Sequence, residues 1–243
     1  MKKILTLLLL TVSFSTHAQL LSWAPDFAKD NDNISITVDA SKGNQGLFNY
    51  ASVSDVYVHT GVITNQSANQ GDWKYVKFNQ NFNQPNAQLQ ATSLGGNKWK
   101  FDITNIRAYY GVPAGETILK IAILFRNGNG SVKQANADGS DLYIPVYDNT
   151  VAVRFTNPLF QPTFTAIPEP LTKQAGDNID LTAVASKSST MKLFLNGTEI
   201  QSAGGVTTLS ASPVLVTTGN QTVRADAIDG ATTRSETFQF FVA

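Results

Sequence analysis

The side chains best suited to recognition are aromatic residues that alternate with valine near position 57. Residues 55–61 read Asp-Val-Tyr-Val-His-Thr-Gly, and successive side chains of a β-strand point to opposite faces. If the two valines point into a core, Tyr57 and His59 project together from the opposite face. The pattern therefore predicts an aromatic pair on the outside of one strand.

A second aromatic run, Gly-Asp-Trp-Lys-Tyr-Val-Lys-Phe, ends at Phe78. We expect it to form a neighbouring strand with Lys74, Val76 and Phe78 directed inward, which leaves Trp73 and Tyr75 outward. The two strands would then present one surface of four rings. Such a surface suits sugars, because the apolar face of a pyranose stacks on a ring while its hydroxyls form hydrogen bonds nearby. The alternative is that these rings stabilise the protein core and bind nothing.

The remaining residue types exclude several kinds of catalysis and one class of partner. The chain has no cysteine, and its two histidines are His17 and His59. Because His17 lies in an N-terminal export signal, the rest of the chain cannot complete a zinc site or a two-histidine iron site. No Gly-x-Ser-x-Gly turn is present for a serine nucleophile. Basic and acidic residues are equal in number, 18 each, without a basic block, so nucleic-acid binding is not expected.

Two pairs of carboxylates lie close together in the sequence, Asp30 with Asp32 and Asp138 with Asp141. A glycosidase needs two carboxyl groups about 5 to 10 Å apart, and sequence spacing alone does not establish that geometry. Both runs are polar and typical of solvated loops. We expect no cofactor, although the oxygen ligands of either loop leave calcium open, without the spacing of an EF-hand.

β-Strands are the elements that must position these groups. Trp99, Phe101 and Ile103 alternate with polar residues, residues 117–125 are almost continuously apolar, and Asn196-Gly197 separates two apolar runs as a hairpin turn does. Only residues 105–110 suggest a helix, and this segment is short. The chain is therefore expected to be all-β, which excludes a (β/α)₈ barrel.

Two consecutive β-sandwich modules are expected after a cleaved signal peptide at residues 1–18. The start has two lysines, a short apolar run and Thr-His-Ala before the expected cleavage after Ala18. The run is too short for a membrane anchor, so the protein is expected to be periplasmic, on the cell surface or extracellular. Five of the nine prolines lie between residues 145 and 170, which predicts a stiff linker. The expected divisions are a first sandwich at 19–150, a linker at 151–170 and an immunoglobulin-like sandwich at 171–243.

The first module resembles the starch-binding β-sandwiches attached to secreted amylases. The resemblance lies in Val-Tyr-Val-His at 56–59 and Gly-Asp-Trp at 71–73. In those modules two aromatic or histidine side chains, spaced two apart on one strand, join a tryptophan on the next strand to form an α-glucan surface. The resemblance assigns these positions to Tyr57, His59 and Trp73.

A longer resemblance, covering about residues 20 to 243, is to the leading region of exported α-amylase-superfamily proteins from Bacteroidota. It lies in residues 43–47, 55–64, 110–116 and 138–143, while residues 195–198 and 224–230 resemble the spacer sandwich before the catalytic domain. The catalytic barrel of those relatives does not follow here, so we expect a non-catalytic α-glucan-binding chain that is a piece of a longer enzyme or a truncated product.

Two other functions remain open from the sequence. One is an enzyme in its own right, a β-sandwich glycosidase or lyase that uses a carboxylate pair with lysine or tyrosine. The other is a structural or adhesive protein in which both sandwiches act as spacers and bind no glycan. Burial of Tyr57 and Trp73 would favour the spacer.

Overall fold

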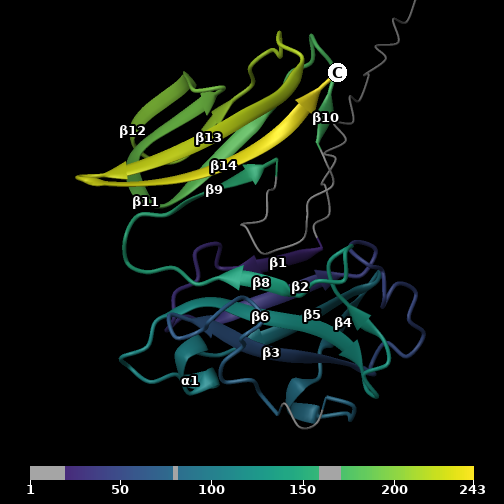
Figure 1. Ribbon diagram of the computed structural model, residues 1–243. Coiled ribbons are helices and arrows are strands. Elements are labelled where there is room, and N and C mark those ends of the chain that lie inside the picture. The colour runs from purple at the N-terminus through teal and green to yellow at the C-terminus, as the bar shows by residue number, and fades with distance from the viewer. Residues whose placement is uncertain (1–19, 79–81, 159–170) are drawn as a thin grey trace, which may run out of the picture.

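The computed structural model describes residues 20–78, 82–158 and 171–243 (Figure 1). The expected signal peptide and most of the expected linker lie outside the described residues. Strands and isolated bridges make up 52% of the described residues and helices 4%, so the protein is all-β, as the sequence predicts, and is not a (β/α)₈ barrel. Within the described ranges, no helix has both the length and the apolar character needed to cross a membrane.

The first sandwich consists of two antiparallel sheets. In spatial order the first sheet contains β1 (Leu21–Ala24), β2 (Ile34–Asp39), β5 (Lys98–Ile103) and β4 (Thr92–Gly95). In the second sheet, β6 (Ile118–Asn127) pairs with β3 (Val56–Thr64) on one side and with β7 (Lys133–Gln134) and β8 (Leu142–Pro145) on the other. A 3₁₀ turn (Ala87–Leu89) and the helix α1 (Ile106–Tyr110) connect strands.

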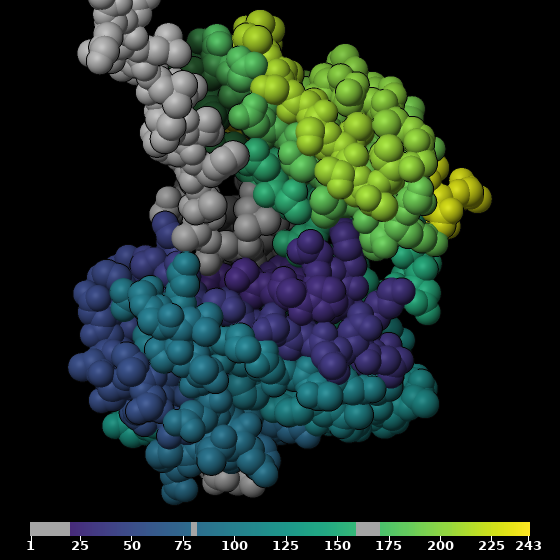
Figure 2. All heavy atoms as spheres, turned by 180° about the vertical axis from the view of Figure 1, so that it is seen from behind, coloured from purple at the N-terminus to yellow at the C-terminus, as the bar shows by residue number. Residues whose placement is uncertain are grey.

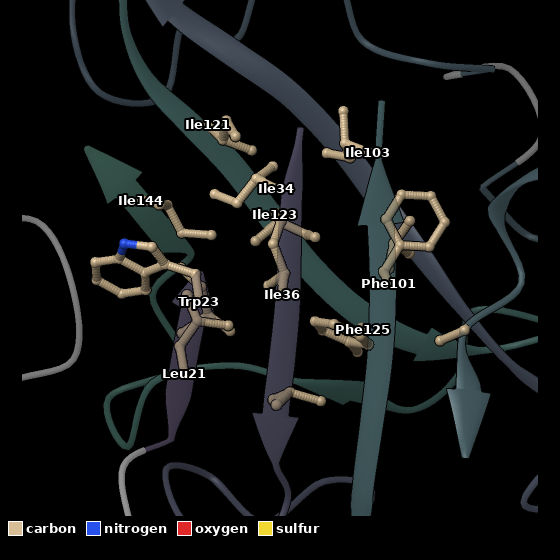
Figure 3. Close-up of a cluster of buried hydrophobic side chains, with 14 of the residues drawn as sticks. Leu21, Trp23, Ile34, Ile36, Phe101, Ile103, Ile121, Ile123, Phe125 and Ile144 are labelled. Carbon is tan, nitrogen blue, oxygen red and sulfur yellow. The ribbon is translucent and has the colours of Figure 1, made fainter. Parts of the chain in front are cut away.

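The inner faces of these two sheets enclose one core. Trp23, Ile36 and Phe101 reach it from the first sheet, and Ile121 and Phe125 reach it from the second (Figure 3). Strand β5 buries every second residue, as the alternation of Trp99, Phe101 and Ile103 predicts. Burial of such large apolar side chains is the main favourable term in folding.

The second sandwich is built around a long hairpin. Its strands are β9 (Val153–Asn157), β10 (Thr172–Lys173), β11 (Leu181–Leu195), β12 (Thr198–Ala211), β13 (Gly219–Asp229) and β14 (Thr232–Val242). Strands β11 and β12 are joined by Asn196 and Gly197, both of which have positive φ, as the sequence predicts for this turn.

One sheet, in the order β10-β14-β13-β11-β12 with β9 also paired to β11, forms the second sandwich and folds over at β11 into two layers. The first half of β11 pairs with β9 and its second half with β13, and the register shifts between Val184 and Ser189. Across the layers, the Phe155 ring of β9 meets the Phe238 ring of β14 edge to face, with centroids 4.9 Å apart. This arrangement closes a second core that shares no buried residue with the first.

The linker expected at 151–170 is wrong in its first part. Residues 153–157 form β9, which pairs with β11, and Val151, Val153 and Phe155 are buried in the second core. The prolines concealed a short strand, Val-Arg-Phe-Thr-Asn, that ends just before Pro158. The second sandwich therefore recruits a strand that precedes the proline-rich residues.

Candidate functional site

Strand β3 places the first predicted pair as the alternation indicates. Val56 and Val58 enter the first core, so Tyr57 and His59 point to the outer face of the second sheet. There Tyr57 lies beside Arg126 of the neighbouring strand β6. The predicted faces of this strand are therefore correct.

The second predicted strand, ending at Phe78, does not form. Within this segment, only Lys74 exchanges a pair of backbone hydrogen bonds with β3. Its N–H donates to the Val62 carbonyl oxygen at 2.8 Å, and its carbonyl oxygen accepts from the Val62 N–H at 2.9 Å. The backbone has positive φ at Tyr75 and Phe78, 53° and 49°, a conformation that non-glycine residues rarely adopt and that interrupts alternation. The segment therefore follows the edge of β3 irregularly, and its odd and even residues do not occupy two separate faces.

This irregular backbone separates Tyr75 from Trp73. Tyr75 packs against the first core, and its hydroxyl donates a hydrogen bond to Glu116. This bond raises the pKa of Tyr75 and, together with one from Thr64, lowers the pKa of Glu116. Trp73 instead packs against the outer-face cluster of Ile63, Ala122 and Tyr143. The expected surface of four rings is therefore wrong, because Tyr75 is not part of it.

An aromatic cluster, defined here as Tyr57, His59, Trp73, Phe82 and Tyr143, occupies the outer face instead. The His59 ring stacks on Trp73 with centroids 5.5 Å apart and planes at 25°. Phe82 meets the His59 ring edge-on at 5.0 Å, and Trp73 meets Tyr143 edge-on at 6.3 Å. The rings therefore contact one another and do not lie side by side in a flat array.

Arg126 and several hydrogen bonds secure the aromatic cluster to the sheet. The Arg126 guanidinium lies 5.1 Å from the centroid of Phe82 and 5.7 Å from that of Tyr57. It also donates to the carbonyl oxygen of Gln84, at 3.0 Å. Trp73 Nε1 donates to the Tyr143 hydroxyl at 3.3 Å, and that hydroxyl donates to the Gln70 carbonyl oxygen at 2.7 Å. Both residues 65–78 and 82–90 are thus tied down over the outer face.

Burial differs across the cluster. Tyr57 is 9% exposed and Arg126 1% exposed, whereas His59 and Trp73 are half-buried. Burial lowers the pKa of His59, and the charge of Arg126 lowers it further, so the imidazole is neutral at neutral pH and stacks as an uncharged ring. Of the four predicted residues, only Trp73 and His59 both belong to the cluster and are partly exposed.

Sequence reasoning missed Arg126, Tyr143 and Phe82. Tyr143 lies between two core residues of β8, so alternation would have placed it outward. Arg126 follows the apolar run of β6 at an outward position, opposite Tyr57. Phe82 has no such signal, because it lies in an amide-rich segment without strand periodicity.

Three of the four carboxylates singled out in the sequence, Asp30, Asp32 and Asp138, have structural partners. Asp30 accepts two hydrogen bonds from Arg107, at 2.9 and 2.7 Å. Asp32 accepts from the backbone of Lys29 at 2.8 Å, and Asp138 closes a turn with the backbone and hydroxyl of Ser140. Burial raises the pKa of Asp141. The described part of the chain brings no group of three or more histidine, aspartate or glutamate side chains together as metal ligands.

A second feature that could carry function is the contact between the two sandwiches, where β1 and β9 face each other (Figure 1). Arg154 extends from β9 over the ring of Trp23 in β1, with its guanidinium carbon 4.6 Å from the ring centroid. Its Nη1 lies 3.3 Å from the Asp26 carbonyl oxygen and 3.5 Å from the Asp26 carboxylate. Arg154 is 3% exposed and Trp23 8% exposed, so the stacked pair is shielded from water, while Asp26 lies exposed at its edge.

Two aromatic residues extend this contact, which we call the junction: Trp23, Asp26, Phe27, Tyr147 and Arg154. The rings of Phe27 and Tyr147 meet edge to face at 5.1 Å, and burial raises the pKa of Tyr147 to about 12. Figure 2 shows the purple N-terminal residues of the first sandwich directly beside the green second sandwich. Sequence reasoning missed the junction, whose only signal is an arginine inside the alternating apolar strand β9.

Comparison with known proteins gives one family match and several structural likenesses. Residues 22–134, which run from β1 to β7, match the family model described as domain of unknown function DUF8578. No curated protein matches the chain.

Among solved structures, the D0-D1 domain of intimin is 12% identical, with a TM-score of 0.38, over 91% of this chain and 97% of that one. The CARDB domain of a Pyrococcus furiosus protein is 14% identical, with a TM-score of 0.27, over 39% of this chain and 93% of that one. The fibronectin(III)-like modules of Clostridium thermocellum CbhA are 19% identical, with a TM-score of 0.25, over 39% of this chain and 99% of theirs.

Proposed function

We propose that this chain is a non-catalytic spacer of an exported protein, in which two β-sandwiches are held at a fixed relative orientation. The observation that carries this proposal is Arg154, a buried cation of the second sandwich that lies on Trp23 of the first. Domains of one chain move relative to each other by default unless their interface is large or well packed. A desolvated cation–π contact is worth about 2 kcal/mol, and that free energy opposes separation of the two sandwiches.

The aromatic cluster supports the same proposal. Tyr57 is buried. The His59 ring contacts Trp73 and Phe82, and the Trp73 ring also contacts Tyr143. A flat sugar-binding surface needs ring faces that are free for the ligand. Most of the ring surface in this cluster packs residues 65–78 and 82–90 onto the sheet.

The relative orientation can be measured directly because the chain contains no cysteine. Cysteines introduced at Leu94 of the first sandwich and Val216 of the second, both exposed, can be spin-labelled and their separation measured by pulsed electron paramagnetic resonance. At pH 5.5 we expect one narrow distance distribution. Arg154→Ala should broaden it, because the sandwiches lose their buried contact.

Arg224→Ala is the matched control. Arg224 also lies over an aromatic ring, 4.0 Å from the centroid of Phe194, and pairs with an aspartate, but all within the second sandwich. This variant should leave the distance distribution narrow. A broad distribution in the unmodified protein would contradict the proposal.

α-Glucan binding is a second candidate, favoured by the half-buried Trp73 and His59, which come together on the outer face. Together with the resemblance to starch-binding modules, this supports a small site in which one sugar ring stacks on Trp73, within the leading region of an exported amylase. Affinity electrophoresis in amylopectin gels, with dextran and xylan as comparison polymers, tests this candidate.

Retardation by amylopectin alone, lost in Trp73→Ala, would support binding at the aromatic cluster. Phe241→Ala is the control, because Phe241 is an exposed ring on the other sandwich, and its removal should not change the mobility. Circular dichroism would confirm that both variants fold. Equal mobility of the unmodified protein in all gels would exclude the α-glucan candidate and leave only the spacer proposal.

A further inference from the structure

Strand β12 leaves one edge of the second sandwich open. It pairs with β11 on one side and ends the sheet order β14-β13-β11-β12. Within the described ranges, no backbone hydrogen bond is formed along its other side. Figure 1 shows β12 at the margin of the second sandwich. In a strand with one neighbour, about half of the backbone N–H and C=O groups point away from that neighbour, so this edge can accept a further strand.

Three other sheet edges in the described part of the chain are short or covered. Strands β4 and β10 contain four and two residues. The outer edge of β3 is covered by Lys74 and Lys77, whose N–H groups donate to carbonyl oxygens of β3 at 2.8 and 2.9 Å. Short edge strands and covering segments keep proteins from pairing edge to edge. Strand β12 has 14 residues and neither protection.

Residues 206–211 are the part of this edge best suited to pairing. They read Val-Thr-Thr-Leu-Ser-Ala, without charge, proline or glycine. Six-residue segments of such composition and high β-propensity pair readily with other strands. Leu209 is buried in the second core, whereas Thr208 and Ser210 are exposed. The buried leucine holds the run in place, and the exposed residues mark the face on which a partner's side chains would lie beside them.

The first half of β12 is less suited, because a bulge separates it from this run. Gly204 and Gly205 lie where the register with β11 shifts, and Gly205 has a positive φ of 72°. A bulge bends a strand and interrupts its ladder. This half also carries Glu199, the one charged residue of the strand. Beyond residue 211, Pro213 has no N–H to donate, so the pairing run is bounded at both ends.

We propose that residues 206–211 pair antiparallel with the same residues of a second copy of this chain, so that two second sandwiches form one continuous sheet. Such a pair has two-fold symmetry, in which the same edge serves both partners. The run suits itself as a partner, because it is uncharged and the Glu199 side chains of the two copies lie at opposite ends of the paired strands. The proposal goes beyond the spacer function and does not depend on the junction.

Antiparallel pairing determines which side chains meet. Residues directly opposite each other in an antiparallel pair lie on the same face of the sheet, and the two copies are related by a two-fold axis. When the two runs overlap most fully, Thr208 of one copy therefore lies opposite Thr208 or Ser210 of the other. A pair of six-residue strands is small beside the about 1,200 to 2,000 Å² of a standard interface, so the dimer should be weak and should depend on protein concentration.

Sedimentation velocity at increasing protein concentration, up to about 1 mM, tests the pairing. The protein should shift from monomer to dimer. Thr208→Lys should weaken the dimer by about tenfold or more, because it brings two positive charges together across the two-fold axis. Thr190→Lys is the matched control: Thr190 is an exposed threonine of β11, which has a paired strand on each side. This variant should dimerise like the unmodified protein.

A charge exchange separates a loss of pairing from a defect in folding. Thr208→Glu alone should also weaken the dimer. An equal mixture of the Thr208→Lys and Thr208→Glu variants should dimerise at least as strongly as the unmodified protein, because opposite charges then meet across the axis. A misfolded variant would not be rescued in this way. In the unmodified protein, hydrogen exchange of the backbone amides in residues 206–211 should slow as the concentration rises.

Three results would overturn the proposal. One is a protein that stays monomeric up to about 1 mM. Another is a dimer that Thr208→Lys leaves intact, or that Thr190→Lys weakens equally, since the contact would then lie elsewhere. The third is a mixture of the two charged variants that stays monomeric. The distance measurement on Arg154→Ala does not depend on these results, so the spacer and the dimer can fail separately.

Discussion

At the scale of single residues, the outer face of the second sheet is shaped by the two segments that cover it, residues 65–78 and 82–90. The outward position of Tyr57 and His59 follows from the valines around them. The separation of Trp73 from Tyr75 does not, because it depends on a positive φ at Tyr75 that no residue type in the segment signals. Exposure is less predictable still, since residues 65–78 and 82–90 cover the outer face by contacts with residues far away in the sequence.

Gly61 is the residue that permits this covering, and replacing it provides a prediction. A Cβ at position 61 would lie 2.9 Å from the Lys74 carbonyl oxygen and 3.0 Å from Val76 Cγ2. Gly61→Ala should therefore destabilise the first sandwich by about 1 to 3 kcal/mol, measured by denaturant unfolding. Gly115→Ala is the control, because no atom lies within 4 Å of its added Cβ. Equal stability of the two variants would show that the 74–76 segment is not held against β3.

At the scale of elements, most strands could be predicted, because alternating and continuous apolar runs and an Asn-Gly turn mark them directly. Two strand predictions were wrong: the strand expected to end at Phe78 does not form, and β9 was missed because neighbouring prolines outweighed the alternation of Val151, Val153 and Phe155. Prolines restrict the local backbone, but they do not determine which sheet recruits the strand before them. The pairing of β9 with β11 is decided by burial in the second core.

Replacing Phe155 tests whether β9 belongs to the second sandwich in solution. Its ring is fully buried against Phe238, so Phe155→Ala should destabilise the second sandwich by about 3 to 5 kcal/mol. Phe241→Ala removes an exposed ring from the same sandwich and should cost less than about 0.5 kcal/mol. Thermal unfolding followed by circular dichroism compares them. If Phe155→Ala leaves the stability of the second sandwich unchanged, residues 151–157 act as a linker.

At the scale of the whole molecule, the sequence predicts two modules but not their contact. The junction joins Trp23 and Asp26 to residues more than a hundred positions later, and no local pattern connects groups so far apart. The two cores share no buried residue, so each could unfold alone. The junction is therefore the feature that can make the two sandwiches respond as one body.

This coupling is measurable by scanning calorimetry. In the unmodified protein, unfolding of either sandwich removes the junction from the other, so the two transitions should lie close together and each should respond to Gly61→Ala or Phe155→Ala. In the Arg154→Ala background, Gly61→Ala should lower only the transition of the first sandwich, and Phe155→Ala only that of the second. The Arg224→Ala background, which loses a similar arginine–aromatic contact within one sandwich, should retain the coupling. Independent transitions already present in the unmodified protein would mean that the junction contributes little, since coupling can be no larger than the free energy of the contact that carries it.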